Sequence, residues 1–174
     1  IIWTSFTNFF RRWYDYFNDL DHFEKIVKAN KCFLEVVRPG GEGRTVLSVV
    51  TTHLWTDLAK VLVDNGANVD AIDNYDCTPL YYAVTYINHD TAENYALVKS
   101  MLEKSRFDIN RVYNRRKKSW VHETSTLLEG ARRQGNHYLE TLLIQHGAKE
   151  SSDSRNAKIK ISRFMHHSEI FFRY

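Results

Sequence analysis

The most regular pattern of hydrophobic and polar positions in the chain predicts two short helices joined by a tight turn. Apolar residues predict the first helix over Leu47–His53. Leu58, Val61 and Leu62 follow at i, i+3 and i+4, which gives the second helix one stripe for burial. Gly66 stands just beyond, where a helix end favours φ > 0. Two helices this short cannot bury such a stripe alone, so we expect copies of the pair beside them.

Two further copies are present in the sequence. The start of the first helix, Thr45-Val46-Leu47, recurs as Thr78-Pro79-Leu80 after 33 residues and again as Thr126-Leu127-Leu128. The segment 139–148 matches the segment 58–67 position for position. From Thr78 to Thr126 is 48 residues, so the middle copy carries 48 − 33 = 15 extra residues.

The recurrence of turn, helix and cap residues at a 33-residue period resembles the ankyrin-repeat family over about Val36 to Lys149. The resemblance implies an all-α solenoid of about four helix-turn-helix repeats with irregular capping ends. In such a stack the fingers and first helices line an extended concave surface. We divide the chain into an N-terminal capping or degenerate repeat (1–35), ankyrin repeats within 36–149 (about 43–71, 73–110 and 111–149) and a C-terminal capping segment (150–174).

The two ends are the least regular parts. In the first twenty residues, aromatic side chains at helical spacing predict an amphipathic helix. We favour a helix that caps the open end of the solenoid, and the alternative is a helix that contacts a membrane surface or a partner. Residues 21–31 then repeat the spacing of the second helix. At the other end, 157–174 is predicted to form a covering helix, although its alternating pattern also permits a strand.

The extra residues of the middle copy are expected in two places. About seven lie in the turn at 88–95, before a helix predicted from Ala96 to Lys104, and eight lie in an enlarged finger at 111–125. Arg106 occupies the position of the helix-ending glycine, which predicts strain of roughly 1–2 kcal/mol there. Asp76 also stands where the family usually has glycine, and aspartate tolerates φ > 0 better than most residues.

Composition and motifs mainly exclude other classes of protein. The 174 residues, 43% of them hydrophobic, include only 7 Gly and 2 Pro, which suits one folded domain. We find no nucleophile, phosphate-loop or metal-ligand motif, so we expect no enzymatic activity, no cofactor and no metal. The apolar stretches are too short to span a bilayer. Cys32 and Cys77 are expected as free thiols in a reducing compartment.

The expected function is therefore protein binding. Among four tyrosines, we expect Tyr75 and Tyr86 to contact a partner, while Tyr81 and Tyr82 can instead pack between repeats. By the resemblance, the positions that vary between family members are the candidate contacts: Arg44, Thr52, His53, Asn74, Tyr75, Cys77, Thr85, Tyr86, Ser125, Arg133 and Gln134.

A basic run in the enlarged finger offers an alternative function. It consists of Arg115, Arg116, Lys117 and Lys118, with Trp120 close behind. A solvated loop is the simplest interpretation, but the run could also bind nucleic-acid phosphate, direct nuclear import or contact an acidic patch of a protein. A net charge of +3 is small for a nucleic-acid-binding protein.

A short chain of few, divergent repeats is also similar to virally encoded ankyrin proteins, including those that look like inhibitors of NF-κB. The segments TVLSVV, TPLYYAV and ALVKSMLEKSRFDIN carry this similarity. It implies a cytoplasmic inhibitor of a host Rel/NF-κB-type factor, which the basic run could also direct to the nucleus. A bacterial effector and a cellular scaffold are the alternatives, and the residues identify neither the partner nor the organism.

Overall fold

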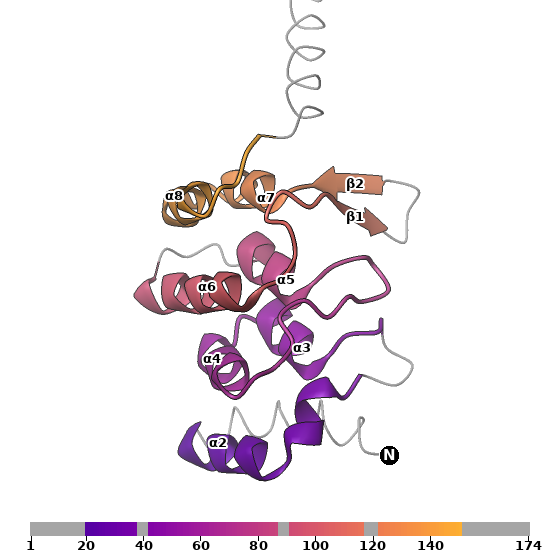
Figure 1. Ribbon diagram of the computed structural model, residues 1–174, viewed down its shortest axis with the longest axis vertical. Coiled ribbons are helices and arrows are strands. Elements are labelled where there is room, and N and C mark those ends of the chain that lie inside the picture. The colour runs from indigo at the N-terminus through magenta and orange to yellow at the C-terminus, as the bar shows by residue number, and fades with distance from the viewer. Residues whose placement is uncertain (1–19, 38–41, 87–90, 117–121, 151–174) are drawn as a thin grey trace, which may run out of the picture.

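A computed structural model describes residues 20–37, 42–86, 91–116 and 122–150. These residues form a solenoid of helix pairs stacked along the long axis of the molecule (Figure 1). The predicted helices within 1–19 and 157–174 lie outside the described residues.

The lowest layer of Figure 1 contains α2 (Leu20–Ala29), which is followed by a short 3₁₀ helix, η1 (Lys31–Glu35). Three complete pairs follow, each with an inner helix and then an outer helix. They are α3 (Val46–Thr52) with α4 (Thr56–Asp64), α5 (Pro79–Tyr86) with α6 (Ala92–Lys104), and α7 (Leu127–Arg133) with α8 (His137–Gln145).

A threonine caps the start of each inner helix. Thr45, Thr78 and Thr126 precede α3, α5 and α7, and each hydroxyl oxygen accepts a hydrogen bond from the amide three residues later. Such a cap satisfies an amide that has no partner within the helix. The predicted register of the inner helices is therefore confirmed to within one residue.

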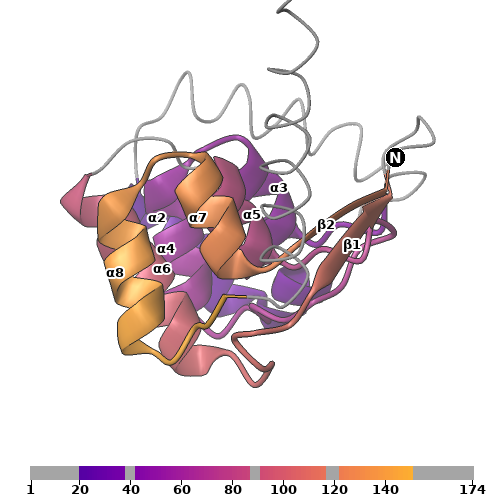
Figure 2. The same cartoon turned by 90° about the horizontal axis from the view of Figure 1, so that it is seen from above.

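Seen along the stack, the molecule has three layers (Figure 2). The outer helices α4, α6 and α8 lie on one side, α3, α5 and α7 lie in the middle, and the fingers project beyond them. The third finger is a β-hairpin of β1 (Tyr113–Arg116) and β2 (His122–Ser125), in which Tyr113 faces Ser125 across the antiparallel pair. The enlarged finger was predicted, but its strands were not.

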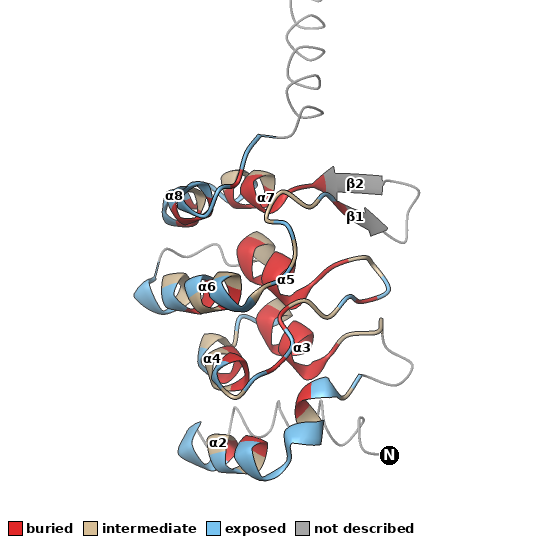
Figure 3. Ribbon diagram, in the orientation of Figure 1, coloured by how far each residue is buried: buried red, intermediate tan, exposed pale blue. Residues whose placement is uncertain are grey.

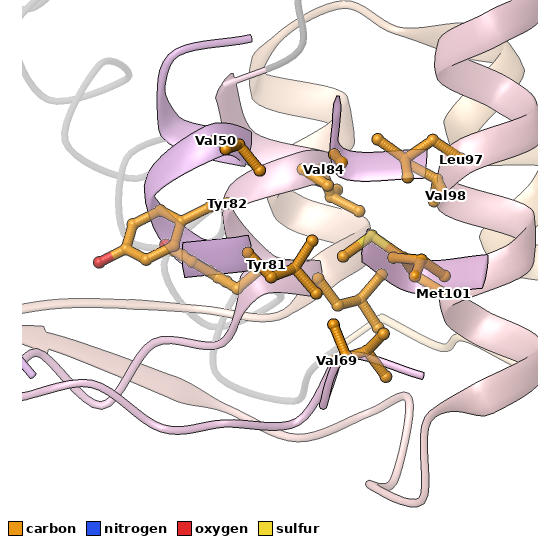
Figure 4. Close-up of a cluster of buried hydrophobic side chains, with 14 of the residues drawn as sticks. Val50, Val69, Tyr81, Tyr82, Val84, Leu97, Val98 and Met101 are labelled. Atoms are coloured by element: carbon orange, nitrogen blue, oxygen red, sulfur yellow. The ribbon is translucent and has the colours of Figure 1, made fainter. Parts of the chain in front are cut away.

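The core is one cluster that runs through the stack: α3 and α5 are buried over most of their length, whereas the outer helices are only partly buried (Figure 3). Of the predicted stripe on α4, Leu58 and Leu62 are buried whereas Val61 is only half-buried. Tyr81 and Tyr82 of α5 are buried among aliphatic side chains from neighbouring elements (Figure 4). These two tyrosines therefore pack between repeats.

Two predicted positions adopt positive φ. Gly66 at the end of α4 has φ +95°, and the amide of Ala67 donates to the carbonyl of Leu62 to close the helix. Asp76, at the family's glycine position in the second finger, has φ +60°. Leu54 was not anticipated: it has φ +61° in the turn between α3 and α4, where the last repeat has Gly135 at φ +68°.

Helix α6 begins four residues earlier than predicted. Thr91 caps it by accepting a hydrogen bond from the amide of Asn94, so Ala92–Tyr95 is helical and does not belong to the turn. The predicted turn at 88–95 is thus wrong over its second half, where the extra residues lengthen α6. Ala92 and Glu93 are good helix formers in the first turn, and the cap places them inside the helix.

The predicted strain at Arg106 is also wrong. Arg106 is not among the described residues with positive φ, because α6 ends through Ser105 in an extended conformation, with φ −69° and ψ 139°. The segment from Leu102 to Ile109 holds one residue more than the corresponding Val63–Val69 segment. Arg106 still follows the C-cap of its helix, as Gly66 does, but the extended Ser105 ends α6 without a left-handed turn. The Arg106 amide instead donates to the Asp70 carboxylate at 2.7 Å.

The last helix pair, α7 and α8, has charged residues at positions where the first complete pair, α3 and α4, packs against the next layer. Thr51 and Ala59 are buried by the α5–α6 layer, whereas Arg132 and Glu140 occupy the corresponding positions of α7 and α8. The guanidinium of Arg132 bonds to Glu140 at 2.7 Å and also pairs with Glu150. Polar outer faces of this kind are typical of terminal repeats in solenoids.

Candidate protein-binding surface

A buried carboxylate organises the second finger. The Asp73 side chain has no exposed surface, and its Oδ1 accepts hydrogen bonds from the amides of Tyr75 at 2.9 Å and Cys77 at 3.0 Å. Its Oδ2 accepts from Nε of Arg44 at 3.3 Å and from the hydroxyl of Tyr82. The carboxylate therefore fixes the turn of the second finger (71–77) and ties it both to Arg44, just after the first finger (32–42), and to α5.

The outward part of this network contains two predicted contact residues. Arg44 lies over the ring of Tyr82 with its Cζ 4.8 Å from the centroid and over Tyr75 at 5.6 Å. The Tyr75 hydroxyl donates to the Glu42 carboxylate at 2.6 Å, and this hydrogen bond raises the pKa of Tyr75. Burial raises the pKa of Tyr82, so its hydroxyl stays protonated as a donor. Both predicted residues thus also hold two fingers together.

The C-terminal ends of α3 and α5 present four more predicted residues at matching positions. Thr52 and Thr85 are half-buried, and each hydroxyl donates to a backbone carbonyl of its own helix. His53 is exposed beside Trp55, with ring centroids 4.9 Å apart. Tyr86 is half-buried and packs edge-on against Tyr82 at 5.7 Å. These contacts orient the side chains but leave part of each surface accessible.

The remaining predicted residues divide into exposed and buried groups. Arg133 and Gln134 continue the same positions at the end of α7 and are exposed, as is Asn74 in the second finger. Cys77 and Ser125 are buried, so neither can contact a partner. Ser125 faces the preceding repeat, where its hydroxyl lies 3.0 Å from that of Tyr81. We call the six residues at the three helix ends, with Asn74 and Tyr75, the finger-side surface.

The third finger is tied to the second by an ion pair. Arg111 donates to the Asp76 carboxylate at 2.7 Å, and its guanidinium lies over the ring of Phe107 at 4.7 Å. Arg115 and Arg116 of the basic run lie on β1. The rest of the run, Lys117 and Lys118, and also Trp120, lie outside the described residues.

Sequence reasoning missed the acidic residues that support these fingers. Asp73 and Glu42 were not singled out, and Asp76 was singled out only for its backbone conformation, although each anchors an arginine or a tyrosine of a neighbouring finger. One signal was available: an aspartate that opens a short turn commonly accepts the amide two residues on. The ion pairs and hydrogen bonds between fingers form only when the repeats stack, so no local sequence pattern predicts them.

The described residues offer neither a metal site nor a membrane span. Within these ranges, no group of three or more His, Cys, Asp or Glu side chains is placed to hold a metal ion. No described helix is long and apolar enough to cross a bilayer. Both cysteines are free thiols, Cys32 exposed and Cys77 buried.

The family model for ankyrin repeats, in three copies, matches residues 15–113, which is more than half of the chain. The chain belongs to the ankyrin-repeat family. The match includes the degenerate first repeat around α2 and ends before α7, where the described geometry continues the ankyrin stack. Ankyrin repeats are generally protein-interaction modules, and their finger side is an extended binding surface.

Individual relatives add little to this family assignment. No curated protein matches the chain. Among solved structures, an ankyrin repeat domain from Acinetobacter baumannii is similar to this chain, with 24% sequence identity and a TM-score of 0.49. The alignment covers 67% of this chain. The alignment covers 53% of that structure, so this chain spans about half of its length.

Proposed function

We propose that the protein is a non-enzymatic adapter that holds a protein partner on its finger-side surface. One observation carries the proposal: three successive inner helices end in accessible pairs, Thr52–His53, Thr85–Tyr86 and Arg133–Gln134, at matching positions in the repeats. The pairs combine aromatic, hydroxyl, amide and guanidinium groups, which suit a protein surface better than a small substrate. The buried core behind them provides a rigid base.

Charge indicates which part of the partner lies near the third finger. Residues 111–125 contain five basic residues and one acidic residue, a net +4, so the rest of the chain has 3 − 4 = −1. The positive charge of the whole molecule is thus concentrated in one finger. An acidic segment of the partner fits this end of the surface, and the attraction would mainly accelerate association.

A Rel/NF-κB-type factor is the partner we propose to test first. The motivation is the similarity of TVLSVV, TPLYYAV and ALVKSMLEKSRFDIN to viral inhibitors of such factors. On this hypothesis the protein acts in the cytoplasm of a host cell. If a purified Rel-type factor does not bind in calorimetry at micromolar concentrations, this partner class is excluded, while the adapter function stays open to other proteins.

The test of the adapter function compares matched variants against a purified partner. Tyr86→Ala removes a half-buried aromatic side chain and should weaken binding by about 1–2 kcal/mol or more. Lys60→Ala on the outer helix α4 is the control and should leave the affinity unchanged. Tyr75→Phe removes the hydrogen bond to Glu42 and keeps the ring, so it separates finger positioning from ring contact.

The contrary outcome is nucleic-acid binding through the basic finger. In that case the affinity for RNA or DNA would fall steeply with salt and disappear on charge reversal at Arg115 and Arg116. Tyr86→Ala would then have no effect. That combination would refute the adapter function.

A further inference from the structure

The junction between the last two helix pairs contains a pocket. Its volume is about 230 Å³ and it is partly open to solvent. Residues of α5, α6, α7 and the 105–109 loop line it, together with Tyr113 of β1 and His146 just after α8. In the preceding junction, Val63, Ala67 and Val69 are buried and close the corresponding space. Leu102, Phe107 and Ile109 replace them here and are only half-buried.

A larger side chain after α6 explains why the pocket opens. Phe107 is the second residue after the C-cap of α6, the position that the buried Ala67 has after the C-cap of α4. A phenyl ring does not fit the space of a buried methyl group. The ring of Phe107 instead lies below the guanidinium of Arg111, and the space between the repeats stays unfilled.

The lining combines an apolar interior with a few polar groups. Leu80 and Leu127 are almost fully buried and form the apolar part. Asp108 and His146 add acceptors: Nδ1 of His146 lies 2.8 Å from the Leu142 carbonyl. This contact requires the ring proton on Nδ1, so Nε2 of the neutral ring is an acceptor.

We propose that this inter-repeat pocket binds a small apolar ring that carries one hydrogen-bond donor, such as an indole-like or phenol-like ligand. The volume suits this class, since an apolar cavity of about 150 Å³ accepts benzene. The donor matches the acceptors of Asp108 and His146, and the apolar ring matches the leucine side chains. The pocket shares no residue with the finger-side surface, so the inference goes beyond the proposed function and does not depend on it.

The test uses indole as the probe and the full chain with methyl labels on leucine and isoleucine. In an NMR titration, the methyl signals of Leu80, Leu102, Ile109 and Leu127 should shift together with one Kd. We expect about 0.1–1 mM, in keeping with the small size of the ligand. 1-Methylindole, which lacks the donor, should bind several-fold more weakly. Equal binding of the two compounds would overturn the assigned hydrogen bond.

Variants decide whether the shifts report this pocket. Ile109→Trp places an indole ring on the lining itself and should abolish binding, and Leu102→Trp does the same from α6 if the first variant does not fold. Glu103→Gln, exposed on α6 and outside the lining, should bind as the unchanged protein does. Absence of shifts at 5 mM probe (roughly tenfold the expected Kd), or binding that survives a folded tryptophan variant, would overturn the proposal.

Discussion

Replacing Asp73 by alanine should cause one of the largest losses of stability in this molecule. Its carboxylate accepts four hydrogen bonds: two from amides of its own turn, one from Arg44 and one from the Tyr82 hydroxyl. Alanine removes both acceptor oxygens, and with them all four hydrogen bonds, at a side chain with no exposed surface. Each buried donor that loses its acceptor costs about 1–3 kcal/mol, and breaking a buried ion pair costs about 3–5 kcal/mol in total.

We therefore expect Asp73→Ala to lower the free energy of unfolding by about 3–5 kcal/mol. Arg44 is partly exposed and can turn toward water, so the full sum of four donors is not reached. Asp73→Asn is the matched control. Its amide oxygen can still accept from the Tyr75 and Cys77 amides, but its NH₂ group faces the Arg44 donor, so the loss should be smaller, about 1–3 kcal/mol.

Urea unfolding followed by circular dichroism measures both losses, provided that the m-values stay unchanged. Tyr82→Phe, alone and combined with Asp73→Asn, completes a double-mutant cycle for the buried hydroxyl. A loss below about 1 kcal/mol for Asp73→Ala, or equal losses for alanine and asparagine, would refute the reasoning. In that case the carboxylate would not be the group that holds the fingers.

Three further predictions concern other parts of the stack. Leu54→Gly should raise stability by about 0.5–1 kcal/mol in urea unfolding, because Leu54 has φ +61° and is 42% exposed; Leu54→Ala keeps the strained backbone and should not stabilise. Leu62→Ala should cost about 2–5 kcal/mol, since the side chain is fully buried, and a thermal shift of only a degree or two would contradict its place in the core. The hydrogen bond from Arg132 lowers the pKa of Glu140 in the folded protein. The ionised Glu140 carboxylate therefore stabilises the fold above its unfolded pKa of about 4.3, and this stabilisation is lost as the pH falls. The difference in unfolding free energy between the protein and Glu140→Gln should therefore shrink from pH 7 to pH 3. A difference that grows would contradict the lowered pKa of Glu140.

The period of the sequence was enough to predict the stack of helices. Thr45, Thr78 and Thr126 act locally as helix caps, so a pattern read within a few residues placed the inner helices correctly. Gly66 and Asp76 were predictable for the same reason, because a positive φ is a property of a single position.

The failures came from features that depend on exact length or on distant partners. The segment after Leu102 is one residue longer than its counterpart, and α6 ends through the extended Ser105 without a left-handed turn at Arg106, which the alignment by motif did not detect. Cys77 was expected on the surface but is fully buried. Asp73 was overlooked because two of its four hydrogen bonds reach residues outside its turn, Arg44 and Tyr82.

Hydrogen–deuterium exchange of the complex with a captured partner, purified to homogeneity, tests the central claim most directly. The account predicts protection on binding at the ends of α3, α5 and α7 and in the second finger, around Thr52, Tyr75, Tyr86 and Arg133. The outer faces of α4 and α8 should exchange as in the free protein. Protection confined to those outer helices, with none at the inner-helix ends, would contradict the finger-side binding surface.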